Sequence, residues 1–302
     1  MRVSRIGLGT WQFGSREWGY GDDYATTVAP ALVQRAVELG ITVIDTAEFY
    51  GLGRSERIIG ATLAALPQRE RAALTVATKF MPVAPAESIV ARQAAGSRRR
   101  LGIDSLDLYY VHWPNPFVSQ RRVMQSLRPL LESGAVRRVG VSNYSLRQWI
   151  DAERALRAPV IANQVPFSLV DPRPAHDLVP HAAALGRLVV AYSPLGQGLL
   201  AGAGESVSPG GIRALGPRFR EDRRRRAAPL LAAVREVASA HGATPAQVAL
   251  AWVIRHPNTV AIPGARTVAQ LQANAAAADL ELSDDEFHRL TAESEAFAAI
   301  RG

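Results

Sequence analysis

The chain has 302 residues, of which 48% are hydrophobic and 21% charged, a balance typical of globular domains. No apolar run reaches the roughly 18 residues that a membrane helix needs, and the N-terminal residues lack the apolar stretch of a signal peptide. There is no cysteine, which excludes a disulfide scaffold, thiolate catalysis and cysteine metal sites. We therefore expect a cytoplasmic protein without a membrane partner.

The net charge of +8 comes almost entirely from arginine, because Lys79 is the only lysine among 35 basic residues. The arginines are scattered along the chain, whereas nucleic-acid-binding proteins gather basic charge on one face, so we expect no nucleic-acid partner. The densest cluster, Arg218–Arg226, is interpreted as a solvated loop, with phosphate binding as the alternative. Arginine cannot easily replace lysine where a compact ammonium with an adjustable pKa is needed. Lys79 is therefore a candidate catalytic residue.

Short β-rich runs alternate eight times with helical patterns. The expected strands are residues 5–10, 41–45, 74–79, 106–111, 137–141, 160–164, 188–192 and 259–262. Helical patterns cover 28–39 and about 56–66, and the pairs Thr244/Gln247 and Ser283/Glu286 have capping-box spacing at the start of two more helices. Several strands are continuous apolar runs, as in a parallel sheet buried on both faces. The pattern predicts an α/β fold, a (β/α)8 TIM barrel that forms a single domain over residues 1–302.

The alternative architecture is a doubly wound open sheet. Its dinucleotide fingerprint requires three glycines after an early strand, but Gly7 and Gly9 are followed by Thr10, Trp11 and Gln12. The fingerprint is therefore missing. The segment at about 193–229 is rich in Gly, Pro, Ser and Arg and is expected to be one long loop, either functional or disordered.

Polar residues end nearly every predicted strand: Thr10, Asp45, Lys79, His112, Ser142, Asn143, Gln164 and Tyr192. Pro263 and Gly264 follow the last one. A barrel gathers the carboxyl ends of its strands at one mouth, so these side chains are expected to converge. Each alone has an ordinary structural interpretation, such as a cap, a turn or a packed histidine. No His-x-x-x-His pair occurs among the six histidines, so no metal site is expected.

Four of these residue types together suit carbonyl chemistry. A tyrosine has a pKa near 10, and a nearby ammonium lowers it by favouring the phenolate. A carboxylate keeps the ammonium charged, and a histidine can orient a carbonyl oxygen. Asp45, Tyr50, Lys79 and His112 supply that set, with Tyr50 as the proton donor that hydride reduction of an aldehyde or ketone requires.

The chain resembles the aldo-keto reductases over almost its whole length, in particular bacterial members related to the potassium-channel beta subunits. The matching stretches are 7–11, 44–51, 54–56, 77–79, 111–114, 140–144, 163–169, 191–196 and 262–266. The resemblance implies a (β/α)8 barrel that binds NADPH without a Rossmann domain. It makes Tyr50 the general acid, Asp45 and Lys79 its tuning pair, and His112 the residue that orients the substrate.

The resemblance also implies a set of cofactor-binding residues: Thr10, Trp11, Ser142, Asn143, Gln164, Tyr192, Ser193, Leu195, Gly196, Gly264, Arg266, Gln270 and Asn274. Among them Tyr192 would stack on the nicotinamide, and Arg266 would grip the 2′-phosphate, which favours NADPH over NADH. The chain departs from many relatives at Ala273, where they carry a glutamate that contacts adenine. Trp11, Phe49 and Trp113 are expected to rim the substrate pocket.

We therefore expect an NADP-dependent oxidoreductase that reduces a small-molecule carbonyl compound. One alternative is a non-catalytic, cofactor-sensing binding module of the channel-beta-subunit type, and another is a barrel isomerase or hydrolase that uses no nucleotide. The natural substrate, the direction of the reaction and the oligomeric state do not follow from the sequence.

Overall fold

The computed structural model describes residues 3–14, 21–201 and 221–299. Its eight strands are all parallel and follow one another in chain order. They are β1 Leu8–Gly9, β2 Val43–Asp45, β3 Thr75–Phe80, β4 Leu108–Val111, β5 Val139–Ser142, β6 Val160–Pro166, β7 Leu188–Tyr192 and β8 Thr259–Ala261. The predicted strands are confirmed, with ends that differ from the prediction by at most three residues.

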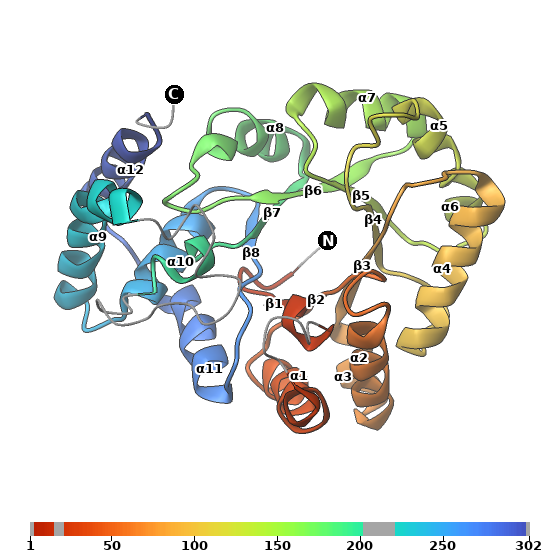
Figure 1. The fold of residues 1–302 in the computed structure, drawn as a ribbon, viewed down its shortest axis with the longest axis horizontal. Helices are drawn as coiled ribbons and strands as arrows, with labels where there is room; N and C mark the ends of the chain where they lie inside the picture. Colours follow the sequence, from red (N-terminus) through yellow and green to blue (C-terminus); the bar gives the residue numbers. More distant parts are fainter. Residues whose placement is uncertain (1–2, 15–20, 202–220, 300–302) are drawn as a thin grey trace.

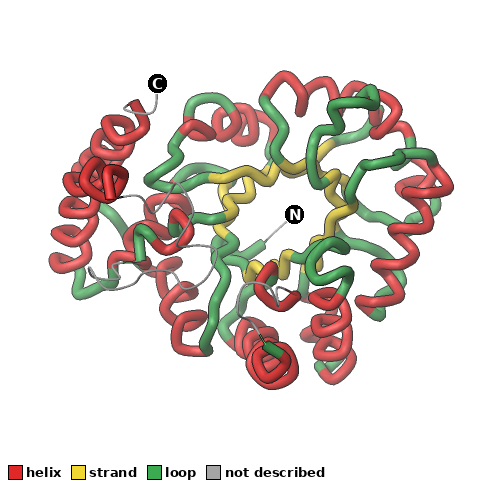
Figure 2. The backbone as a smooth tube through the Cα atoms, viewed as in Figure 1, coloured by secondary structure: helices red, strands yellow, loops and turns green. Residues whose placement is uncertain are grey.

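The sheet closes on itself through the residues that precede β1. The Gly7 N–H donates to the Ala261 carbonyl at 2.8 Å, and the Ala261 N–H donates to the Arg5 carbonyl at 2.9 Å. These bonds explain why the sequence predicts a strand from residue 5, although β1 itself is short. Figure 2 shows the resulting ring of strands with helices around it, so the predicted (β/α)8 barrel is confirmed and the open sheet is wrong.

Helices surround the barrel on the outside (Figure 1). They are α1 Ala29–Glu38, α2 Arg54–Ala65, α3 Gln68–Ala73, α4 Glu87–Leu101, α5 Gln120–Gln125, α6 Arg128–Glu132, α7 Leu146–Leu156, α8 Leu178–Leu185, α9 Glu221–Ala240, α10 Pro245–Arg255, α11 Val268–Ala276 and α12 Asp284–Ala299. Both predicted capping boxes form: Gln247 with Thr244 before α10, and Glu286 with Ser283 before α12. Within the described ranges, no helix is long and apolar enough to span a membrane.

The long loop predicted at 193–229 is wrong in its last part, because α9 already begins at Glu221. The buried positions Ala227, Leu230, Val234 and Val237 are three or four residues apart, which is helical spacing. That apolar stripe carries the helix through Pro229, a residue that more often ends one. Residues 202–220, and with them Arg218 and Arg220, lie outside the described residues.

An apolar layer fills the inside of the barrel, formed by Val43, Ala77, Leu108, Tyr110, Ala162, Val190, Val260 and Ile262. Side chains along a strand alternate between its two faces, so the next inward position is two residues further on. Two residues beyond members of this layer stand Asp45, Lys79, His112, Gln164 and Tyr192. The strand period thus places the polar side chains predicted from the sequence on one level, above an apolar floor.

Candidate active site

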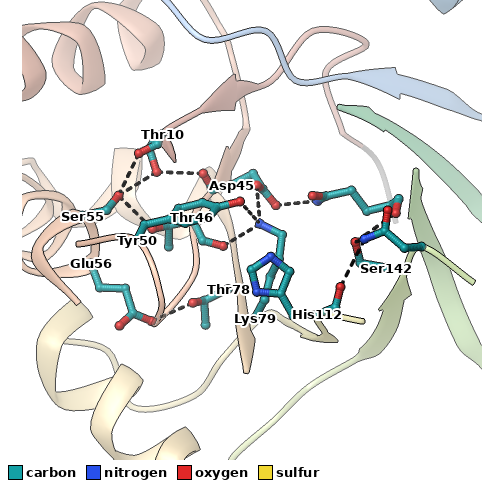
Figure 3. A network of polar contacts seen from close by, with 12 residues as sticks. Thr10, Asp45, Thr46, Tyr50, Ser55, Glu56, Thr78, Lys79, His112 and Ser142 are labelled. Carbon is teal, nitrogen blue, oxygen red and sulfur yellow. Dashed lines mark hydrogen bonds and ion pairs between the residues drawn. The ribbon is translucent and has the colours of Figure 1, made fainter. Parts of the chain in front are cut away.

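A buried ion pair lies at the centre of the barrel mouth (Figure 3). The Nζ atom of Lys79 is 2.6 Å from Oδ1 of Asp45, and both side chains are almost fully buried. Lys79 also donates to the Thr46 carbonyl at 2.8 Å and to the Tyr50 hydroxyl at 3.2 Å. Burial alone would lower the pKa of Lys79, but the carboxylate of Asp45 and the phenol of Tyr50 raise it, so the ammonium stays charged. The structure therefore brings three of the four predicted catalytic residues into direct contact.

The phenol of Tyr50 is protonated in this site. Burial raises its pKa, the Lys79 ammonium opposes that rise, and the Asp45 carboxylate adds to it. The sequence led us to expect a lowered pKa, because it shows the neighbouring cation but not the loss of solvation around the ring. Lys79 can only donate hydrogen bonds, so the Tyr50 oxygen accepts from it. The Tyr50 proton is consequently free to be donated elsewhere.

His112 stands beside Tyr50, with ring centroids 5.9 Å apart and planes at 76°. Burial, and secondarily the charge of Lys79, lowers the pKa of His112 to about 3, so the ring is neutral near pH 7. Its buried Nδ1 atom has no hydrogen-bond partner within the described structure. A neutral imidazole next to a phenol suits the orientation of a carbonyl oxygen.

Two glycines hold the loop that carries Tyr50 close to the turn after β1. A Cβ atom on Gly14 would lie 2.5 Å from the Tyr50 carbonyl oxygen, and one on Gly51 would lie 2.5 Å from the Gly14 oxygen. Gly51 also has a φ of +57°, which favours glycine. The backbone contact is therefore possible only with glycine on both sides, and it fixes where Tyr50 leaves the loop.

A cluster of buried hydroxyl groups ties the same loop to β1 and α2. The Ser55 hydroxyl lies 2.8 Å from Oγ1 of Thr10 and 2.9 Å from Oγ1 of Thr46, and Thr10 Oγ1 donates to the Asp45 carbonyl at 2.8 Å. Thr10 is 0% exposed. This differs from its predicted role as a cofactor-binding residue, because its hydroxyl is used inside the protein and no surface remains for a ligand.

Glu56, in the first turn of α2, connects β3 to α4. Its side chain is fully buried, accepts from the Thr78 hydroxyl at 2.6 Å and pairs with Nε of Arg100 on α4 at 2.6 Å. Thr78 precedes Lys79 on β3, so the pair fixes the strand that carries the ammonium. Sequence reasoning missed the structural roles of Ser55 and Glu56. The start of the helical pattern near Glu56 gave their position, but not that the first turn of α2 faces the barrel.

The residues predicted to bind the nicotinamide lie on the opposite side of the mouth. Tyr192 donates to Oδ1 of Asn143 at 2.8 Å, and Nδ2 of Asn143 donates to the Ser142 hydroxyl at 3.0 Å. Asn143 and Tyr192 are half-buried. Gln164 is only 2% exposed, and its amide donates to Oδ2 of Asp45 at 2.7 Å. The structure thus joins this group to the ion pair.

A second part of the predicted cofactor site surrounds the turn between β8 and α11. The Gln270 side chain accepts from the Arg266 N–H at 2.8 Å, and Asn274 donates to the Gly264 carbonyl at 3.4 Å. Arg266 is exposed and directly precedes Thr267, the N-cap of α11. An exposed guanidinium beside a helix N-terminus suits a phosphate.

The predicted turn after β7 is tight. Ser193 and Gly196 both have positive φ values, of +50° and +57°, and the Gly196 N–H donates to the Ser193 carbonyl at 2.9 Å. Leu195 lies within the turn, directly before the short helix Gly196–Gly198. A Cβ atom on Gly196 would lie 2.8 Å from Cγ2 of Val170, so the turn requires glycine there.

Exposed apolar side chains lie in the loops that follow β2, β3 and β4. Phe49 and Trp113 are 61% and 47% exposed, and the Trp113 ring stacks on His112 at a centroid distance of 6.3 Å. Trp11, the third predicted rim residue, is half-buried in the turn Trp11–Gly14. Sequence reasoning missed three further exposed residues of these loops: Leu52, Val83 and Phe117. Asn115 links two of the loops by donating to the Pro82 carbonyl.

No group of three or more His, Cys, Asp or Glu side chains within the described ranges is arranged to hold a metal ion. The structure is a barrel whose mouth brings together a tyrosine, a lysine, an aspartate and a histidine. Comparison with known proteins assigns the family: residues 5–295 match the Aldo/keto reductase family. The chain belongs to this family and is an oxidoreductase.

Individual relatives support the assignment. The chain is 52% identical over 300 residues to an uncharacterized oxidoreductase of Mycobacterium tuberculosis, an alignment that covers 99% of this chain and 92% of that protein. It is 34% identical to the methylglyoxal reductase YeaE of Escherichia coli, covering 98% and 92%. The crystal structure of an aldo/keto reductase from Klebsiella pneumoniae in complex with NADP and acetate superimposes with a TM-score of 0.77, at 31% identity, covering 95% of this chain and 90% of that one.

Proposed function

We propose that the protein reduces an aldehyde or ketone to an alcohol with NADPH, and that Tyr50 donates the proton. The observation that carries this proposal is the contact of 3.2 Å between the Lys79 ammonium and the Tyr50 hydroxyl. A protonated phenol whose oxygen already accepts from a fixed cation is arranged to give up its proton. The same cation then stabilises the phenolate that remains.

The cofactor supplies a hydride to the carbonyl carbon when it is bound. The chain's own residues do the rest. His112 orients the carbonyl oxygen toward Tyr50, whose O–H bond breaks as the new alcohol O–H bond forms. Asp45 keeps Lys79 charged and in place throughout. The phenolate of Tyr50 regains a proton from solvent after the alcohol leaves.

The residues present fit NADPH. Tyr192 and Asn143 are accessible on the side of the mouth opposite Tyr50, where the nicotinamide would lie, and the turn from Ser193 to Gly196 would border the pyrophosphate. Arg266 and the N-terminus of α11 would hold the 2′-phosphate, which NADH lacks. We therefore expect NADPH to be preferred over NADH.

The rim favours an uncharged, apolar carbonyl compound. Phe49, Trp113 and Phe117 are exposed apolar side chains in loops 46–53 and 112–119, and Glu48 is the only ionisable side chain besides Tyr50 and His112 in those loops. The relative named methylglyoxal reductase makes methylglyoxal a sensible member of a substrate panel.

The test is NADPH oxidation by the purified protein with a panel of aliphatic, aromatic and dicarbonyl aldehydes. A parallel titration follows the quenching of tryptophan fluorescence by NADPH. We expect both binding and turnover. Binding without turnover of any aldehyde would favour the cofactor-sensing module instead, and the absence of NADPH binding would refute the proposed cofactor.

A further inference from the structure

The carboxylate of Asp45 is held by two different partners, one on each oxygen. Oδ1 accepts from Lys79 at 2.6 Å, and Oδ2 accepts from the amide of Gln164 at 2.7 Å. Asp45 is 3% exposed, so solvent offers Oδ2 little. A buried carboxylate oxygen that loses its donor carries the full cost of desolvation, and the Gln164 amide removes that cost.

The position of Gln164 is itself fixed by the neighbouring strand. Its backbone carbonyl accepts from the Ser142 hydroxyl at 3.0 Å and from the Asn143 N–H at 2.8 Å. Through Asn143 this arrangement continues to the hydroxyl of Tyr192. A continuous set of hydrogen bonds therefore runs from β7, through β5 and β6, to the ion pair on β2 and β3.

We infer that Gln164 is a positioning residue for Asp45, and that it links the cofactor side of the mouth to the proton-donating side. This inference rests on the proposed function only in stating which side of the mouth holds the cofactor and which side donates the proton. Gln164 is almost fully buried and its amide donates to Asp45. Both observations support this role over one in cofactor binding alone. Its consequence is that Gln164 acts on Tyr50 indirectly, through Asp45 and then Lys79.

Loss of the amide should make Asp45 easier to protonate. Without a donor at Oδ2 the ionised form of Asp45 is less stable, so the pKa of this buried carboxyl rises. The titratable groups that face Lys79 are Asp45 on β2, Tyr50 in the following loop and His112 at the end of β4. Tyr110, on β4, lies near Asp45 and Gln164.

The sequence offers a direct measurement, because Lys79 is the only lysine. Protein grown with lysine labelled by carbon-13 at the ε position gives one side-chain resonance, which shifts without cofactor or substrate when Asp45, 2.6 Å from the ammonium, gains a proton. We expect Gln164→Met, which keeps the length of the side chain but removes the donor, to move this titration step to a pH roughly one unit or more higher, because the pKa of Asp45 rises. The matched control Gln12→Met removes a buried amide that donates to two backbone carbonyls, and should leave the step unchanged.

A titration step at the same pH in Gln164→Met and in the wild type would overturn the inference, and so would an equal shift in Gln12→Met. If Gln164→Met does not fold, Gln164→Glu provides a second test. An ionised carboxylate at that position adds negative charge beside Asp45 and should raise the pKa of that carboxyl, and an unmoved titration step would again refute the link. A wild-type protein without reductase activity would refute the proposed function, but would leave this measurement valid.

Discussion

Lys79 uses its three N–H groups on three oxygens: the carboxylate of Asp45, the carbonyl of Thr46 and the hydroxyl of Tyr50. A compact ammonium can donate to three acceptors arranged around one atom, whereas the larger guanidinium of arginine donates only within its plane. This geometry explains why one lysine stands in a chain that otherwise uses arginine. The ammonium therefore has two roles: it holds the loop after β2 at Thr46, and it donates to the hydroxyl of Tyr50.

Lys79→Met is expected to lower kcat for aldehyde reduction by about 10²-fold or more, because the developing phenolate loses its cation. It also leaves Asp45 buried without its charged partner, which we expect to destabilise the fold by about 3 kcal/mol. Steady-state kinetics with NADPH and urea denaturation measure the two effects. A kcat within about threefold of wild type would show that the lysine is incidental.

His112 should make stability depend on pH. The pKa of the buried ring is about 3, against 6.5 for an exposed histidine, so between these values the unfolded chain binds a proton that the folded protein does not. The stability that His112 contributes is complete above pH 6.5 and is lost as the pH falls toward 3. Urea denaturation of wild type and His112→Gln at about pH 7 and about pH 5 should show a smaller pH effect in the variant. An equal pH effect in both proteins would contradict the assignment.

At the scale of elements, α2 connects the catalytic loop to the rest of the barrel. Its first turn supplies Ser55 to the hydroxyl cluster and Glu56 to Thr78 and Arg100. The helix also lies very close to α4, because a Cβ atom on Gly60 would be 2.2 Å from the Arg100 carbonyl oxygen. The position of Tyr50 therefore depends on how α2 packs against α4 and β3.

Glu56→Ala should destabilise the protein by about 3 kcal/mol, because it removes a fully buried carboxylate and leaves Thr78 and Arg100 without their acceptor. The matched control is Glu38→Ala, which breaks an exposed pair with Arg35 on α1 and should cost less than about 1 kcal/mol. Urea denaturation of the three proteins gives the comparison. Equal stability of the two variants would refute the anchoring role of Glu56.

The sequence predicted elements well where a single physical rule decides them. Apolar runs located the strands, and capping boxes located the starts of α10 and α12. Prediction failed where packing overrides local preference, as in α9, whose apolar stripe continues through Pro229. Residue types at strand ends indicated the site, but the burial of Thr10 and the contact between Gln164 and Asp45 depend on the closed barrel. No local pattern contains that information.

At the scale of the whole molecule, the proposed site draws residues from both sides of the barrel and from the turn before α11. A ligand that bridges them should stabilise the fold as a unit. We expect NADPH at about 100 times its Kd to add about 2.7 kcal/mol to the free energy of unfolding, visible as a rise in Tm. The same concentration of NADH should have a smaller effect, because NADH lacks the 2′-phosphate that Arg266 would bind. Equal shifts with both nucleotides would contradict the role of Arg266.

The most direct test of the account is the kcat of Tyr50→Phe with NADPH and an aldehyde that the wild type reduces, together with the Kd of NADPH from fluorescence quenching. The substitution removes only the hydroxyl that Lys79 contacts. We predict a loss of at least about 10²-fold in kcat with an unchanged Kd. A variant that binds NADPH normally and keeps most of its turnover would show that Tyr50 is not the proton donor.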